Sequence, residues 1–133
     1  MIVFLDTCPV IYFVEQPPVW GPKASARLAV LRAAGEQLAV SDLVRMECLV
    51  GPLKSGDATV LASYQAFFTA PGVQVLPMAA AVYDRAASIR ATHGFKPLDS
   101  LHLATAVEHG CQLFLTNDAR LSRFPDIPVE VLS

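Results

Sequence analysis

Five short, mostly apolar runs, separated by segments long enough for one or two helices, constrain the fold of this chain most strongly. The runs are residues 2–5, 38–40, 73–76, 113–115 and 129–132. A continuous apolar run of this length is typical of a strand that is buried on both faces. Strands that alternate with helices predict an α/β fold with a mostly parallel central sheet. The length of 133 residues fits a single domain, which we expect to span residues 1–133.

The segments between the runs repeat apolar residues at helical spacing and carry helix boundary signals. We expect helices at residues 9–14, 22–34, 42–50, 57–69, 79–93 and 98–108. Ser41 and Asp57 are suited to helix N-termini, because a short side-chain oxygen accepts a hydrogen bond from a free backbone N–H group. Gly51 and Pro52, and then Gly56, predict breaks after the third of these helices.

The composition excludes several classes of protein. Hydrophobic residues make up 53% of the chain and charged residues 17%, which is the opposite of the balance in a disordered protein. A net charge of −2 argues against a protein that coats nucleic acid with a broad basic face. No signal peptide or long apolar span is evident, so we expect a cytoplasmic protein without a membrane partner. Cys8, Cys48 and Cys111 are widely spaced, which favours free thiols over disulfides or a zinc site.

Four acidic residues lie at positions that a parallel sheet brings to one edge. Asp6 directly follows the first strand, and Asp118 follows the fourth. Glu47 lies on the helix after the second strand, and Asp99 opens the helix before the fourth. Ligands of open α/β sheets bind beyond the carboxyl ends of the strands, so these four carboxylates can converge on one site.

Each of these acids also has an ordinary structural explanation. Asp99 could be a helix N-terminal charge, Asp118 a turn residue and Glu47 a solvated side chain. However, Asp6, Glu47 and Asp99 have largely apolar sequence neighbours, and an isolated buried charge is costly. A divalent cation removes the repulsion between clustered carboxylates, and oxygen ligands favour Mg²⁺ or Mn²⁺. Carboxylate-held metal ions of this kind activate water for attack on phosphodiesters.

The chain resembles the PIN-domain family, and specifically the VapC-like toxin ribonucleases of bacterial toxin–antitoxin pairs. Four segments carry the resemblance, in family order and over nearly the whole chain: residues 4–7 (FLDT), 40–47 (VSDLVRME), 98–106 (LDSLHLATA) and 115–121 (LTNDARL). The resemblance implies a three-layer α/β/α sandwich around a central, mostly parallel sheet. It also implies hydrolysis of single-stranded or structured RNA by metal-activated water.

The same resemblance implies the site residues and the partners. It gives catalytic roles to Asp6, Glu47, Asp99, Asp118 and Thr116, with the four acids as ligands of Mg²⁺ or Mn²⁺. It implies a homodimer and a cognate VapB-like antitoxin. We expect the apolar faces of the helices at 22–34 and 57–69 to contribute to these contacts. Without the four acids of the site, eight acidic residues remain against ten basic ones. This modest excess of basic residues could contact an RNA substrate.

Several assignments stay open from the sequence. Thr7 could contact Asp6 or simply cap the next helix, and Asn117 could be only a turn residue. His102 is three residues after Asp99 and could be a base, although a packed helical histidine is the simpler interpretation. Asp42 competes with Glu47 but fits better as a first-turn charge. The alternative function is a non-hydrolytic PIN-fold module that binds RNA or acts within its antitoxin complex.

Overall fold

The computed structural model describes all 133 residues, and its centre is a sheet of five parallel strands in the order β3-β2-β1-β4-β5. The strands are β1 (Ile2–Leu5), β2 (Gln37–Ser41), β3 (Val73–Leu76), β4 (Leu113–Thr116) and β5 (Val129–Val131). The prediction of a parallel sheet built from these five runs is therefore confirmed. The central strand β1 and its neighbour β4 consist mainly of fully buried residues, as expected for strands covered on both faces.

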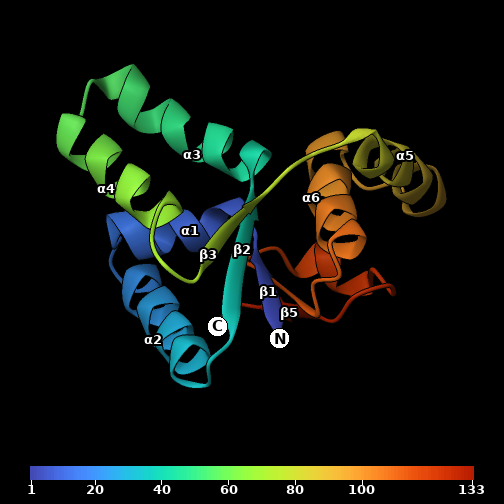
Figure 1. The fold of residues 1–133 in the computed structure, drawn as a ribbon, viewed down its shortest axis with the longest axis horizontal. Helices are drawn as coiled ribbons and strands as arrows, with labels where there is room; N and C mark the ends of the chain where they lie inside the picture. The colour runs from blue at the N-terminus through green and yellow to red at the C-terminus, as the bar shows by residue number, and fades with distance from the viewer.

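Helices cover both faces of the sheet, which confirms the predicted three-layer α/β/α sandwich. The helices are α1 (Thr7–Glu15), α2 (Trp20–Ala33), α3 (Asp42–Ser55), α4 (Ala58–Phe68), α5 (Ala80–His93) and α6 (Pro97–Glu108), and a short 3₁₀ helix, η1 (Ala119–Arg123), follows β4. Figure 1 shows α1 to α4 on one side of the sheet and α5 and α6 on the other.

The predicted helix caps form as expected. The Ser41 hydroxyl accepts a hydrogen bond from the backbone N–H of Val44 at 3.2 Å, and the Asp57 carboxylate accepts one from Val60 at 3.0 Å. Each cap satisfies a backbone donor that the first helical turn cannot pair internally. The Ser41 cap fixes the start of α3, and this helix carries Glu47 toward the carboxyl edge of the sheet.

The predicted break at Gly51 and Pro52 is wrong, because α3 continues to Ser55. Pro52 is buried, so its packing offsets the backbone hydrogen bond that its ring removes. The helix ends instead at Gly56, whose left-handed backbone (φ 73°) is the conformation glycine adopts readily. The predicted break at Gly56 is therefore confirmed.

Thirty buried apolar residues form one core cluster that extends through all three layers. Phe4 of β1 and Phe114 of β4 stack at its centre with ring centroids 5.3 Å apart. Tyr64, Phe67 and Phe68 of α4 are buried in the same core. Aromatic pairs of this kind add to the stabilisation that comes from burying apolar area.

We expected the apolar faces of α2 and α4 to be free for partners. These faces are part of the core, so the residues predicted for the contacts are wrong. On α2, Leu28 and Leu31 are almost fully buried within the chain. On α4, Tyr64, Phe67 and Phe68 are buried, and Val60 packs against the core. The apolar periodicity of both helices reflects their packing into the core, where both contact α1, which is the usual cause of such a pattern.

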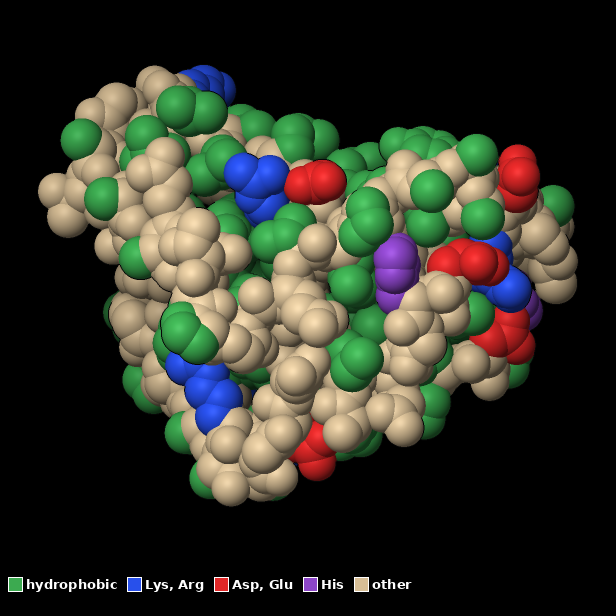
Figure 2. Space-filling model, in the orientation of Figure 1, with side chains coloured by type: hydrophobic (Ala, Val, Ile, Leu, Met, Phe, Trp, Pro, Cys, Tyr) green, Lys and Arg blue, Asp and Glu red, His purple; other side chains and the backbone are tan.

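The surface carries scattered charges, with no continuous basic face on the side that Figure 2 shows. None of the helices combines the length and the apolar character needed to cross a bilayer. The three cysteines are free thiols, as predicted, and two of them are buried.

Candidate active site

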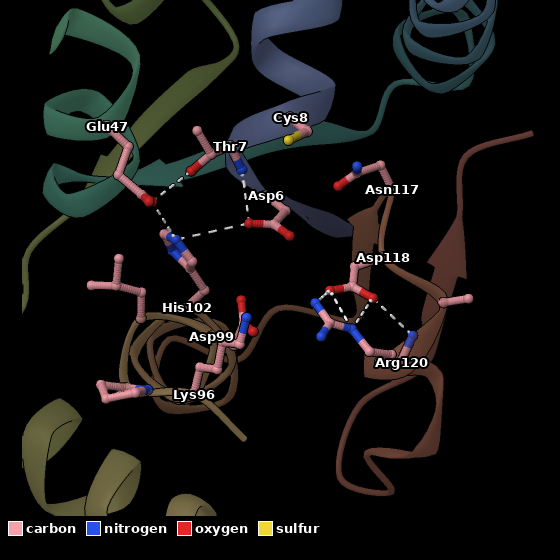
Figure 3. Close-up of a pocket in the computed structure, with 13 residues that line it drawn as sticks. Asp6, Thr7, Cys8, Glu47, Lys96, Asp99, His102, Asn117, Asp118 and Arg120 are labelled. Carbon is pink, nitrogen blue, oxygen red and sulfur yellow. Dashed lines mark hydrogen bonds and ion pairs between the residues drawn. The ribbon is translucent and has the colours of Figure 1, made fainter. Parts of the chain in front are cut away.

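The strand order changes direction between β1 and β4, and a pocket of about 730 Å³ opens at the carboxyl ends of these two strands. This is the place where open α/β sheets bind ligands. Asp6, Glu47, Asp99 and Asp118 all line the pocket, so the structure brings together the four predicted acids (Figure 3). They come from four segments that are far apart in the sequence.

Asp6 is held in place by both of its carboxylate oxygens. Oδ1 accepts a hydrogen bond from the backbone N–H of Thr7 at 2.8 Å, which makes Asp6 the N-cap of α1. Oδ2 accepts a hydrogen bond from the hydroxyl of Thr116 at 2.7 Å. The same hydroxyl oxygen accepts a hydrogen bond from the backbone N–H of Asp118 at 3.1 Å. Thr116 therefore connects Asp6 and Asp118, the acids that follow β1 and β4. Thr116 itself is fully buried, which restricts it to this position.

Glu47 reaches the pocket from the second turn of α3 and is fixed by two neighbours. Its Oε1 accepts a hydrogen bond from the Thr7 hydroxyl at 2.8 Å and lies 2.7 Å from Nε2 of His102. The hydrogen bond from His102 is the main reason that the pKa of Glu47 is lowered, against the opposing effect of burial. Glu47 therefore stays an anion in its half-buried position.

His102 lies between two of the acids rather than only in the core. Its Nε2 is 3.8 Å from Oδ1 of Asp6 and closer still to Glu47, and the side chain is almost fully buried (Figure 3). Because an ionised carboxylate only accepts hydrogen bonds, Nε2 carries the proton that it shares with Glu47. Nδ1 is buried without a hydrogen-bond partner.

Asp99 and Asp118 differ in how their charges are balanced. Burial, followed by repulsion from Asp6 and Asp118, raises the pKa of Asp99. Asp118 instead pairs with the guanidinium of Arg120, the shortest contact being 2.6 Å from Nη2 to Oδ2, and this hydrogen bonding lowers the pKa of Asp118. Lys96 also lines the pocket and adds a second cationic side chain to it.

The residues of the pocket fit a divalent cation. Four carboxylates face only two permanently charged cations, and repulsion from Asp6 and Asp118 adds to the effect of burial in raising the pKa of Asp99. The donors are hard oxygen atoms, which suit Mg²⁺ or Mn²⁺. No group of three or more acidic, histidine or cysteine side chains lies close enough together to form a complete metal site. Mg²⁺ does not require one, because it keeps several waters and is commonly held by one or two carboxylates together with substrate phosphates.

The sequence left the contacts of several pocket residues open. His102 and Thr7, which were left open, both contact Glu47, and Arg120 pairs with Asp118. The position of His102 one helical turn after Asp99 was the available signal, since residues three apart share a helix face. Asn117, also left open, lines the pocket and donates a hydrogen bond to the hydroxyl of Tyr12 rather than to one of the acids. Asp42 lies outside the pocket and pairs with Arg45, as the first-turn interpretation predicted.

The chain is similar to known proteins over most of its length. A family model described as the PIN domain matches residues 3–127. Ribonuclease VapC19 of Mycobacterium tuberculosis is 37% identical over 109 residues, which are 80% of this chain and 84% of the relative. The similarity to this relative therefore extends over most of both chains.

Solved structures with the same fold include two toxin–antitoxin complexes. The VapBC2 complex of Rickettsia felis, bound to a DNA fragment from its promoter, matches with a TM-score of 0.83 at 19% identity over 100% of both chains. The DNA-bound VapBC complex of Salmonella typhimurium matches with a TM-score of 0.79 at 21% identity over 98% of both chains. At these identities, the two structures show that the fold is shared.

Proposed function

This chain belongs to the PIN-domain family, and we propose that it is a metal-dependent endoribonuclease that acts as the toxin of a toxin–antitoxin pair. The observation that carries the proposal is the convergence of four carboxylates from four separate segments in one pocket. The extensive similarity to a relative named as a ribonuclease supports the same activity. The proposed PIN domain spans residues 1–133, since Leu132 is still buried in the core.

The proposed metal ligands are Asp6, Glu47, Asp99 and Asp118, acting on Mg²⁺ or Mn²⁺ directly or through water. Such an ion, when bound, supplies an acidified water and a positive charge for the leaving oxygen of an RNA phosphodiester. Asp6 is the best-placed ligand, because Thr7 and Thr116 fix both of its oxygens. A carboxylate that is already oriented loses little freedom when it binds, which is the advantage of such supporting contacts.

The surrounding residues position the acids and the substrate. Thr116 is a positioning residue for Asp6, and His102 and Thr7 orient the carboxylate of Glu47. Lys96 and Arg120 lie at the edge of the pocket and supply positive charge for the phosphates of single-stranded RNA. The net charge of −2 is compatible with this role, because the acids of the metal site account for a third of the twelve acidic residues.

The proposed partners are a VapB-like antitoxin and a second copy of the chain. Two neighbours with the same fold are VapBC complexes, which supports an antitoxin partner. Exposed apolar side chains available for such contacts lie on α3, at Met46, Val50 and Leu53. A patch of this kind is commonly an interaction site in a small domain. In a bacterial host, expression of the chain should arrest growth, and co-expression of its cognate antitoxin should restore it.

Cleavage of RNA by the purified, antitoxin-free protein tests the enzymatic proposal. We expect Mg²⁺ or Mn²⁺ to support cleavage, a chelator to stop it, and Asp6→Asn or Asp99→Asn to abolish it while the protein stays folded. Asp42→Asn is the matched control, because Asp42 is an exposed acid outside the pocket. No cleavage of a broad RNA panel would favour the non-hydrolytic alternative, and unchanged cleavage in both site variants would rule out the metal site.

A further inference from the structure

We propose that the stacked side chains of Tyr12 and Trp20, together with Lys23, form a subsite that binds one nucleobase of the RNA beside the catalytic pocket. The inference rests on the proposed ribonuclease function, because the base would belong to the substrate of that pocket. It adds a binding role for three residues that take no part in the metal site.

The three side chains form a mixed aromatic and cationic surface. The rings of Tyr12 and Trp20 stack with centroids 5.6 Å apart and an interplanar angle of 24°. Nζ of Lys23 lies 4.8 Å from the centroid of the Trp20 ring. Trp20 is 37% exposed, and Lys23 is exposed and forms no salt bridge. An accessible ring beside a free ammonium group is suited to a base and its phosphate.

The surface is continuous with the catalytic pocket through Asn117. This residue lines the pocket, and its Nδ2 donates a hydrogen bond of 3.4 Å to the hydroxyl of Tyr12. In Figure 3, Asn117 lies above Asp118, on the side of the pocket opposite Glu47 and His102. A strand of RNA that extends from the acids past Asn117 would reach Tyr12 and then the Trp20 ring that stacks on it.

The turn between α1 and α2 is built to hold Trp20 in this place. Val19, just before Trp20, has a φ of 73°, which is strained for a β-branched residue. The Gln16 side chain anchors the turn by donating hydrogen bonds to the Phe13 carbonyl at 2.8 Å and to the Ser25 hydroxyl at 2.7 Å. At Gly21, a Cβ atom would lie 2.6 Å from the Cα of Gln16, so only glycine fits there.

This strain is not explained by packing of the core. Trp20 is the single tryptophan of the chain, and a tryptophan that only filled the core would be buried. Val19 is also exposed, at 62%, so the unfavourable backbone does not serve to bury its side chain. The strained turn instead places the indole ring at the surface. Strained backbone of this kind is typical of ligand sites.

Fluorescence of Trp20 tests the subsite directly, since no other tryptophan contributes to the signal. The protein is the Asp6→Asn variant in a chelating buffer, so that the RNA stays intact. A short mixed-sequence single-stranded RNA should quench the emission in a saturable way, because the bound base stacks on the indole. A ribose-phosphate oligomer of equal length without bases should bind weakly and leave the emission unchanged.

Variants separate the subsite from the chemistry of the pocket. Truncation of an aromatic that stacks on a base weakens binding by about five- to 150-fold. In the otherwise unmodified enzyme, Trp20→Ala should raise KM for RNA by a factor in this range and leave kcat within about twofold. Trp20→Phe should retain most of the affinity, and Lys23→Gln should reduce the salt dependence of binding. Tyr83→Ala is the matched control, because Tyr83 is an exposed aromatic on α5, in the opposite layer.

The outcomes distinguish this inference from the proposed function. Normal cleavage with no quenching, and an unchanged KM in Trp20→Ala, would overturn the subsite and leave the ribonuclease intact. Quenching by RNA without any cleavage by the unmodified protein would support the subsite and overturn the enzymatic function. Quenching by the purified antitoxin but not by RNA would assign the surface to the protein partner and overturn the inference.

Discussion

Nε2 of His102 lies 2.7 Å from Oε1 of Glu47, which places a buried imidazole against one acid of the pocket and 3.8 Å from another, Asp6. This contact is the main cause of the lowered pKa of Glu47. It also fixes the direction in which the Glu47 carboxylate points, together with the Thr7 hydroxyl. His102 therefore links α6 to α3 at the carboxyl edge of the sheet.

We expect His102→Ala to reduce RNA cleavage by about 10- to 100-fold, because loss of a side chain that orients a metal ligand has an effect of this size. His102→Gln keeps a donor near Glu47 and should recover part of the rate. The midpoint of thermal unfolding should fall in both variants, since each changes a buried side chain. Equal cleavage by the unmodified protein and His102→Ala would show that the contact is only structural.

Thr116→Val should lower both activity and stability, because the variant keeps the shape of the side chain but removes the hydroxyl that holds Asp6 and accepts the N–H of Asp118. Leaving buried polar groups unpaired costs about 1–3 kcal/mol. Thr116→Ser should retain the function of the hydroxyl. Urea unfolding and initial cleavage rates measure the two effects.

Thr105→Val is the matched control for Thr116→Val. Thr105 is equally buried, but its hydroxyl only donates to the Leu101 carbonyl within α6. The control should cleave RNA at the normal rate. A loss of cleavage in Thr105→Val as large as in Thr116→Val would show that removal of any buried hydroxyl disturbs the site.

Arg120→Gln tests whether the guanidinium competes with the metal for Asp118. Arg120 makes its contacts with Asp118 at the exposed edge of the pocket, and exposed ion pairs contribute little. We therefore expect the Mg²⁺ concentration for half-maximal cleavage to fall only a few-fold, and KM for RNA to rise because a phosphate contact is lost. A rise in the Mg²⁺ requirement would contradict this role. Arg85→Gln, which changes a pair with Glu108 away from the pocket, is the control.

The buried thiols predict a loss of stability at alkaline pH. Burial raises the pKa of Cys111 to about 11, whereas a thiol in the unfolded chain ionises near pH 8.5. The folded state therefore holds its proton more tightly, so this contribution is fully present below about pH 8 and is lost as the pH rises toward 11. The urea midpoint should fall over this range, and less steeply in Cys111→Ala. An identical pH dependence in the two proteins would contradict the raised pKa.

Much of the architecture was predictable because strand and helix periodicities are local properties of the sequence. The five apolar runs became the five strands, and the caps at Ser41 and Asp57 formed. The position of Pro52 inside α3 was not predictable, since it depends on burial against other elements. The apolar faces of α2 and α4 were wrongly assigned to partners, because the sequence alone does not distinguish a face that packs in the core from one that forms an interface.

The candidate site was predictable in its acids but not in their supporting contacts. Asp6 and Asp118 follow strands whose ends must meet at one edge of a parallel sheet, so topology alone brings them together. The roles of His102 and Arg120 depend on side-chain directions that only the packed structure defines. His102 contacts Glu47 of α3, which lies on the other face of the sheet, and no local pattern encodes this contact.

The interpretation of the four carboxylates as a divalent-cation site is tested most directly by Mn²⁺ binding, followed through the loss of the electron paramagnetic resonance signal of the free ion. We predict that the unmodified protein binds Mn²⁺. Asp6→Asn and Asp99→Asn should each weaken this binding at least about tenfold, because each removes a charged oxygen ligand. Asp42→Asn should bind Mn²⁺ like the unmodified protein. Equal Mn²⁺ affinity in all four proteins would contradict the site.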